Sequence, residues 1–329
     1  MDFTQRSDLA TEIIKIKKTD EKDGILTEEF TSNGIFINKI TVKTENAAKN
    51  IGKPCGTYIT VDLSGAFSSD ETHTKAVDAI AEELKELIGE DLSDSAMIVG
   101  LGNSELTSDA IGPQTVSGLI VTRHLKQHLP EVYSAMPLRE TAAFLPGVLG
   151  HTGIESAETV KAIAKIVEPK VLIIIDALAS RKVDRLCSTV QISDTGISPG
   201  SGVGNDRKEI SEKTVGIPVI AIGIPTVVDA TTLALDLFEE ASKRIREEKS
   251  GDTKKAAEIF EDFDKLSNEA EQIIRKVLSS SESGAGEMIV TPRDIDVIVN
   301  KSSRLLSLAL NKALHGQLEQ EEINALLGQ

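Results

Sequence analysis

The chain has 329 residues and a formal net charge of −16 at pH 7, from 36 Lys and Arg against 52 Asp and Glu. Phosphate binding needs clustered cations, and no Trp and only two Tyr are present for base stacking, so we expect no direct nucleic-acid binding. No apolar run reaches the roughly 18–20 residues of a membrane helix, and the N-terminus lacks a secretory pattern. With only two cysteines, the composition favours a reducing, cytoplasmic compartment and no membrane partner.

The first predicted elements are strands. Residues 25–42 form a hairpin pattern around Asn33-Gly34, because Asn-Gly supplies the positive φ angles of a tight turn. Residues 57–63 predict a further strand. Residues 75–88 then repeat apolar side chains at three- and four-residue spacing, which predicts a helix ending near Gly89.

The middle of the chain alternates buried strands with helices. Nearly continuous apolar runs at 96–101, 171–175 and 219–224 are typical of strands covered on both faces, and residues 155–167 have the spacing of a crossover helix. The sequence therefore predicts an α/β fold of three layers. We expect a mostly parallel central sheet with helices on both faces, an N-terminal β-hairpin and a helical C-terminal region.

The last hundred residues have helical periodicity. Apolar stripes run through 232–248 and 259–277, a small-residue connection spans 279–286, and Thr291-Pro292 has the pattern of a helix start. We divide the chain into four parts. They are an arm at 1–8, a β-rich segment at 9–70, an α/β core at 71–249, and a helical region at 250–329 that packs on the core.

Two aspartates follow apolar strand runs, and open α/β sheets place their sites beyond the carboxyl ends of strands. Asp109 stands in the loop after 96–101, and Asp176 directly follows 171–175. Each could instead cap a helix, as Asp229 is expected to do. If the fold brings Asp109 and Asp176 together, they could share a proton and activate a water, one as base and the other as acid.

Three other patterns favour plainer interpretations. The start of a dinucleotide motif at Gly100 fails because Glu105 occupies the place of its third glycine. Asp194-Thr-Gly matches the signature of pepsin-like proteases, but it occurs once and in an α/β context, so we expect a turn or strand end. His124 and His128 have zinc-compatible spacing without a catalytic Glu between them, which favours a surface pair.

A glycine-rich loop spans residues 198–208 and ends in two cations. Backbone amides around Gly202 and Gly204 could cradle an oxyanion, although glycines also permit a flexible lid. Arg207 and Lys208 could pair with acidic side chains of a substrate.

These motifs together resemble the germination protease family of spore-forming bacteria. The matching segments cover most of the chain and are densest between about residues 97 and 230. They are 99–103, 109–113, 122–125, 145–150, 152–155, 175–179, 191–197, 199–205 and 216–230. The family is also distantly similar to the endopeptidases that mature hydrogenases.

The resemblance implies an endopeptidase that degrades small acid-soluble spore proteins during germination, in the cytoplasm of the forespore or spore core. It implies a self-processing zymogen and a homotetramer. We expect no cofactor. The two aspartates proposed as catalytic in the family match Asp109 and Asp176. A metal-dependent alternative, with His124 or His151 joining the aspartates, stays open, as does a non-catalytic binding module.

The resemblance also gives the N-terminal arm a meaning. Family members prefer an acidic residue before the cleaved bond and a hydrophobic residue after it, followed by alanine. Asp8-Leu9-Ala10 has this pattern, so we predict processing between Asp8 and Leu9. Charge complementarity makes Arg123, like the two cations of the glycine-rich loop, a candidate to receive the acidic residue. Ser108 departs from the family pattern, which has proline before the first aspartate.

Overall fold

The structure is a computed structural model that describes residues 8–9, 11, 24–200, 207–249, 272–273, 288–316, 318 and 322–323. Within these residues the strands form one nine-stranded sheet, in the order β1-β2-β3-β7-β8-β6-β4-β5 with β9 paired to β8. The strands are β1 Ile25–Ser32, β2 Ile35–Val42, β3 Gly56–Asp62, β4 Ala96–Gly100, β5 Thr141–Phe144, β6 Val171–Ser180, β7 Thr189–Ser193, β8 Val219–Asp229 and β9 Ile289–Val290.

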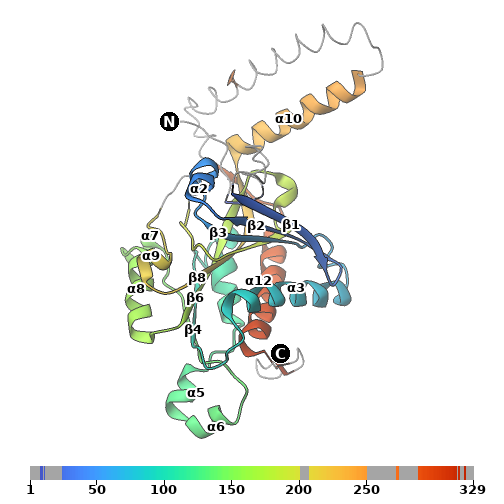
Figure 1. The fold of residues 1–329 in the computed structure, drawn as a ribbon. Coiled ribbons are helices and arrows are strands. Elements are labelled where there is room, and N and C mark those ends of the chain that lie inside the picture. Colours follow the sequence, from blue (N-terminus) through green and yellow to red (C-terminus); the bar gives the residue numbers. More distant parts are fainter. Residues whose placement is uncertain are drawn as a thin grey trace.

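Helices cover both faces of this sheet (Figure 1). The longer ones are α2 Glu45–Ile51, α3 Asp70–Ile88, α4 Ile111–Ser117, α8 Ser156–Val167, α10 Ala230–Lys249 and α12 Ile295–His315. Shorter ones are η2 Thr107–Asp109, α5 Arg123–His128, α6 Pro130–Ser134, α7 Leu149–Thr152, η3 Val183–Arg185 and α9 Glu212–Val215. The predicted hairpin and the helices at 75–88 and 155–167 are confirmed as β1–β2, α3 and α8.

The α/β class and the three layers are confirmed, but the expectation of a mostly parallel sheet is partly wrong. Strands β4, β5, β6 and β8 pair in parallel, whereas β1, β2, β3, β7 and β9 join the sheet through antiparallel pairings. A short connection, the turn at Asn33 and Gly34, accounts for the β1–β2 pairing alone, whereas β3–β7, β7–β8 and β8–β9 pair strands that are linked by long segments of the chain. Antiparallel neighbours accept short links, whereas parallel neighbours need a crossover of a dozen or more residues.

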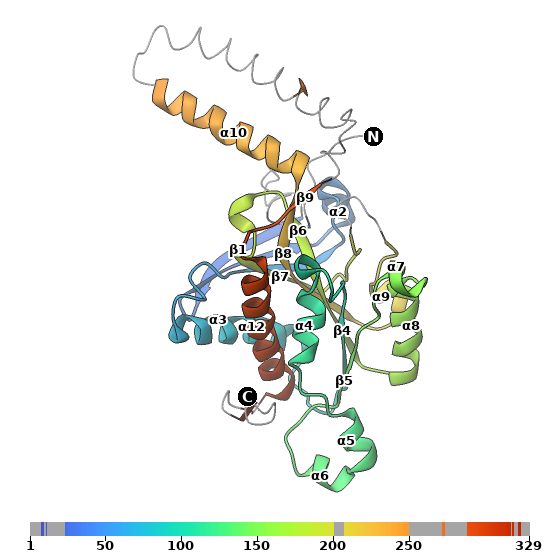
Figure 2. The ribbon, with the colours of Figure 1, turned by 180° about the vertical axis from the view of Figure 1, so that it is seen from behind.

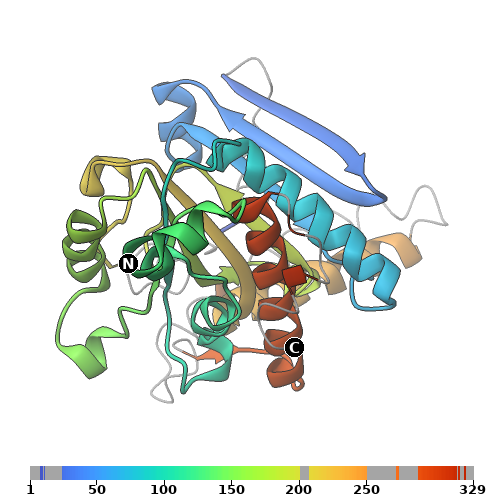
Figure 3. The ribbon, with the colours of Figure 1, turned by 90° about the horizontal axis from the view of Figure 1, so that it is seen from below.

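The main core lies between the sheet and the helices α3, α4 and α12, which Figures 2 and 3 show together on one face. Side chains such as Ile80, Ile173 and Leu306 are fully buried there. On the opposite face α8 packs over β4 and β6, with Val160 and Ile174 buried. The end of the same face near β2 and β3 is covered by α2.

Two strands are longer than their apolar runs indicate. β6 continues to Ser180 and β8 to Asp229, because the two strands stay paired past Ile175 with a register shift at Leu178 and Ala179. Asp176 therefore lies inside a strand. The alternative that it caps a helix is wrong.

The C-terminal helices also differ in part from expectation. Asp229 caps α10 as predicted, since its Oδ1 accepts from the Thr232 N–H at 3.0 Å. The last helix begins at Ile295, with Asp294 as its N-cap, rather than at Thr291-Pro292. The Thr291 hydroxyl instead donates to the Thr226 carbonyl at 2.9 Å, directly after β9.

The expected stripe at 259–277 lies outside the described residues except for 272–273, which are helical. The connection at 279–286 also lies outside them. In the part of the chain that the structure describes, no helix is both long and apolar enough to span a bilayer.

Candidate active site

Asp109 is held by a loop that folds back on itself between β4 and α4. Its Oδ2 accepts from the Asn103 N–H at 2.8 Å. The Thr226 hydroxyl on β8 donates to the Ser108 carbonyl at 2.6 Å, which ties the loop to the sheet. Gly102 has φ +109°, and a Cβ there would lie 2.0 Å from the Asp109 carbonyl oxygen. The loop therefore requires glycine at this position and fixes the backbone of the aspartate.

The alternative role of Asp109 as a helix cap is wrong, because the N-cap of α4 is Ala110 and carries no side-chain cap.

Asp176 lies on β6 and is only 6% exposed. Its Oδ1 accepts from the N–H of the next residue, Ala177, at 2.9 Å. β4 pairs with β6 only as far as Gly100 and Ile175. Beyond that point the edge of β6 is open to other groups, and the Asp176 carboxyl lies at the start of this open stretch.

The two carboxyls have different electrostatic environments. Burial, followed by the nearby charge of Asp109, raises the pKa of Asp176 well above its usual value. Burial also raises the pKa of Asp109, but the Asn103 N–H opposes this by stabilising the ionised form. The pKa of Asp176 is therefore shifted upward more strongly than that of Asp109.

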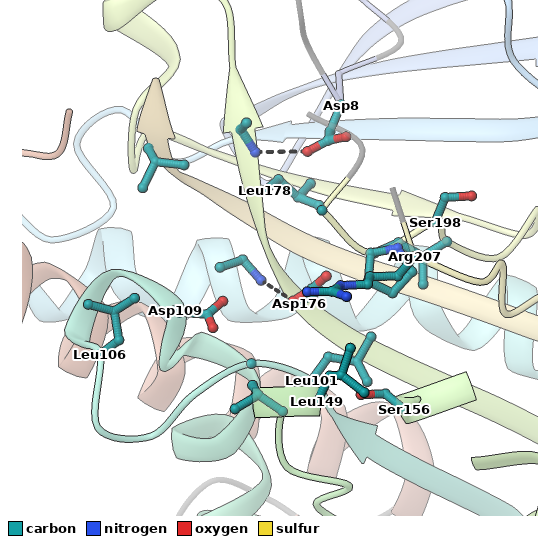
Figure 4. Close-up of a pocket in the computed structure, with 18 of the residues that line it drawn as sticks. Asp8, Leu101, Leu106, Asp109, Leu149, Ser156, Asp176, Leu178, Ser198 and Arg207 are labelled. Carbon is teal, nitrogen blue, oxygen red and sulfur yellow. Dashed lines mark hydrogen bonds between the residues drawn. The ribbon is translucent and has the colours of Figure 1, made fainter. Parts of the chain in front are cut away.

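Both aspartates line one cavity of about 340 Å³. The cavity is lined also by Asp8 from the N-terminal arm and by Arg207 and Lys208 from the glycine-rich loop. Figure 4 shows the carboxyls of Asp109 and Asp176 and the side chain of Arg207 around this space, with Asp8 beside Leu178. Segments far apart in the sequence therefore bring together five of the residues singled out from the sequence.

Asp8, the one residue of the arm that the structure describes, is bound at the open edge of β6. The Asp8 N–H donates to the Ala179 carbonyl at 3.0 Å. In return, the Ala179 N–H donates to Asp8 Oδ2 at 2.9 Å. The next residue, Leu9, is fully buried. Backbone hydrogen bonds to an exposed strand edge are a common way to bind a peptide, and Asp8 makes one such bond.

The three candidate cations of the sequence have acidic partners in the structure. Arg207 Nη1 lies 3.9 Å from Glu155, and Lys208 pairs with Glu158. Arg123 pairs with Glu140 and lines a different cavity. Gly202 and Gly204 lie outside the described residues.

The described residues do not provide the ligands that the metal-dependent alternative requires. Within them, no three His, Cys, Asp or Glu side chains are grouped closely enough to hold a metal ion. His124 lines the same separate cavity as Arg123, and the exposed His151 lies on α7. The interpretation of Asp194 as a strand-end residue is confirmed, since its Oδ1 accepts from the Thr57 N–H at 2.7 Å.

Sequence reasoning missed one cation next to the arm. Lys53 Nζ donates to the main-chain carbonyl of Asp8 at 2.9 Å. Lys53 lies between α2 and β3, more than 120 positions before Asp176, in a segment with no motif that marks a site. The signal available in this segment is the pair of turn residues Gly52 and Pro54, which predicts a connection between elements and not a binding site.

Comparison with known proteins gives consistent results. The sequence model described as germination protease matches residues 5–255. A germination protease of Caldanaerobacter subterraneus subsp. tengcongensis is 40% identical over 98% of this chain and 98% of its own length. One from Clostridium perfringens is 40% identical over 99% of both chains. One from Bacillus thuringiensis subsp. konkukian is 37% identical over 98% of this chain and 97% of its own.

Proposed function

The chain belongs to the germination protease family and is thus a peptidase of spore germination. We propose that it hydrolyses peptide bonds with a water molecule that Asp109 and Asp176 activate. The observation that carries the proposal is the cavity that holds both carboxyls together with Asp8 of the arm. The raised pKa of Asp176 supports it, because a carboxyl that keeps its proton can act as an acid beside an ionised partner.

The proton transfers follow from this asymmetry. The Asp109 carboxylate takes a proton from water while the water oxygen attacks the peptide carbonyl carbon, and Asp176 gives its proton to the carbonyl oxygen. When the C–N bond breaks, Asp109 gives its proton to the departing nitrogen. The hydroxyl proton of the intermediate returns to Asp176, which restores both groups. This cycle predicts a bell-shaped pH profile, rising as Asp109 ionises and falling as Asp176 loses its proton.

The arm is proposed as the first substrate, cut between Asp8 and Leu9 to remove residues 1–8. Its support is the pairing of Asp8 with Ala179 and the complete burial of Leu9, which fits a hydrophobic residue after the cleaved bond. We propose small acid-soluble spore proteins as the later substrates, cut after an acidic residue. A homotetramer in the spore core is the expected state.

The test is the intact mass of the purified full-length chain, followed over time at mildly acidic pH. We expect loss of residues 1–8 in the wild type and none in the Asp109→Asn and Asp176→Asn variants. Asp184→Asn serves as the control, because this aspartate is exposed on η3. Processing of the Asp176→Asn variant at the wild-type rate would overturn the role of this carboxyl.

A further inference from the structure

Lys53 occupies a place that the proposed chemistry leaves without a role. It lines a second cavity of about 240 Å³, which shares Asp8, Leu178, Ile197 and Ser198 with the cavity of the two aspartates. The two cavities therefore meet at the residue that precedes the predicted cleavage point. Lys53 approaches that residue from the side of α2 and β3.

The backbone around Lys53 is fixed at both ends. The Gly52 and Lys53 N–H groups both donate to the Ala48 carbonyl, at 2.8 and 3.2 Å, and close the end of α2. Gly52 has φ +72°, as this type of helix end requires. On the other side, the Tyr58 hydroxyl donates to the Pro54 carbonyl at 2.9 Å. The turn thus presents the Lys53 side chain from a rigid base.

The contact itself joins a cation to the main chain of the arm. Lys53 Nζ donates to the Asp8 carbonyl oxygen at 2.9 Å, while Ala179 binds the Asp8 N–H and carboxylate. All three polar groups of residue 8 are therefore bound. Burial lowers the pKa of Lys53, and the charge of Asp8 acts in the opposite direction. Burial costs the Lys53 ammonium group part of its hydration free energy. The attraction of an acidic side chain at position 8 offsets part of that cost.

We propose that Lys53 and the backbone of Ala179 form the subsite for the acidic residue that precedes the cleaved bond. Lys53 donates to the carbonyl oxygen of that residue, which is the oxygen that Asp176 protonates during cleavage, and it attracts the carboxylate of the same residue. Ala179 pairs with the N–H and the carboxylate of that residue. In the zymogen this subsite holds Asp8, and after processing it receives an acidic residue of a protein substrate. The inference rests on the proposed function for its cleavage step and replaces Arg123, Arg207 and Lys208 as the acid-binding cation.

The first experiment measures self-processing in full-length chains that carry Lys53→Met, Lys53→Arg or Lys49→Met. Lys49 is exposed on α2, so its variant makes the same charge change without touching the arm. Because Lys53 donates a hydrogen bond from a charged group, we expect Lys53→Met to lower the rate of self-processing about tenfold or more. We expect Lys49→Met to process within about twofold of wild type, and Lys53→Arg to restore most of the rate because it keeps the charge and a donor.

The second experiment reads the same contact without catalysis. Hydrogen–deuterium exchange of the peptide containing Ala179 is compared between Asp176→Asn and Asp176→Asn/Lys53→Met full-length chains. Release of Asp8 exposes the Ala179 N–H, so we expect faster exchange in the double variant and no change with Asp176→Asn/Lys49→Met. If processing proves independent of Asp176, the proposed function fails, and the exchange is then read in chains whose intact mass still includes residues 1–8, where it decides the role of Lys53.

The charge selection has its own test in an Asp8→Asn chain. Adding Lys53→Met should slow its processing less than it slows the wild type, because only the carbonyl contact remains to be lost. If Lys53→Met lowers the processing rate equally in the wild type and in the Asp8→Asn chain, Lys53 does not select for an acidic residue. A Lys53→Met chain that processes within twofold of wild type, or one with unchanged exchange at Ala179, overturns the subsite as a whole.

Discussion

Replacing Asp176 by Asn should make the protein more stable than the wild type, by an amount that grows as the pH rises. In the wild type the buried carboxyl keeps its proton to a higher pH in the folded state than in the unfolded chain, where its pKa is about 4. Below about pH 4 the group is protonated in both states and adds no pH dependence. Above that value the unfolded chain loses the proton first, so the unfolding free energy of the wild type falls with pH.

The size of the effect follows from the same linkage. The slope is about 1.4 kcal/mol per pH unit, and it continues until the pH passes the folded-state pKa of Asp176. The Asn variant has no proton to lose and retains an oxygen that accepts from the Ala177 N–H. Its advantage over the wild type should therefore be near zero at pH 4 and should grow by up to about 1.4 kcal/mol for each unit above it.

The assay is urea unfolding of both chains between pH 4 and pH 8, with intact mass measured at each pH so that only wild-type samples that still retain residues 1–8 are compared with the variant. Asp184→Asn again serves as the matched control and should show no such growth, since its carboxyl is exposed. A stability difference between Asp176→Asn and wild type that stays constant across this range would refute the reasoning, because it would mean that burial does not shift the pKa of Asp176.

The loop that carries Asp109 gives two further predictions. Gly102→Ala should cost about 1–3 kcal/mol of stability and slow processing at least tenfold, because its Cβ would meet the Asp109 carbonyl. Gly34→Ala, which also has a positive φ (+84°) but open space around it in the hairpin turn, is the control in unfolding and mass assays, and equal behaviour of the two would contradict the close contact. Thr226→Val should cost about 1–3 kcal/mol, because it leaves the buried Ser108 carbonyl without its donor. Thr226→Ser keeps the hydroxyl, so an equally large loss of unfolding free energy in that variant would assign the effect to packing.

Local patterns predicted the regular elements well where one residue type has one physical consequence. Asn33 and Gly34 have φ values of 52° and 84°, as the hairpin turn requires. The helix over 75–88 was visible because its buried face repeats with the helical period, although α3 begins earlier at Asp70 behind a Ser69 capping box. Such signals are short-range and need no knowledge of the rest of the chain.

These local patterns could not predict which distant segments of the chain pair with each other. An apolar run marks a strand but not its neighbours, so the antiparallel pairings beyond the predicted hairpin were missed. The polar Asp176 ended the apparent strand, yet pairing with β8 carries β6 on to Ser180. Tertiary hydrogen bonds override the local break.

The sequence by itself determined the α/β class, the hairpin and the two aspartates as candidates, because these depend on local periodicity, on turn residues and on recognisable motifs. Only the tertiary structure placed Asp109 and Asp176 at one cavity, and only it brought Asp8, Ala179 and Lys53 into contact. The physical reason is that a binding site depends on distances between groups. Those distances are set by the strand order and by the point at which β4 ends. Both depend on contacts between distant segments, so no single segment of the sequence predicts them.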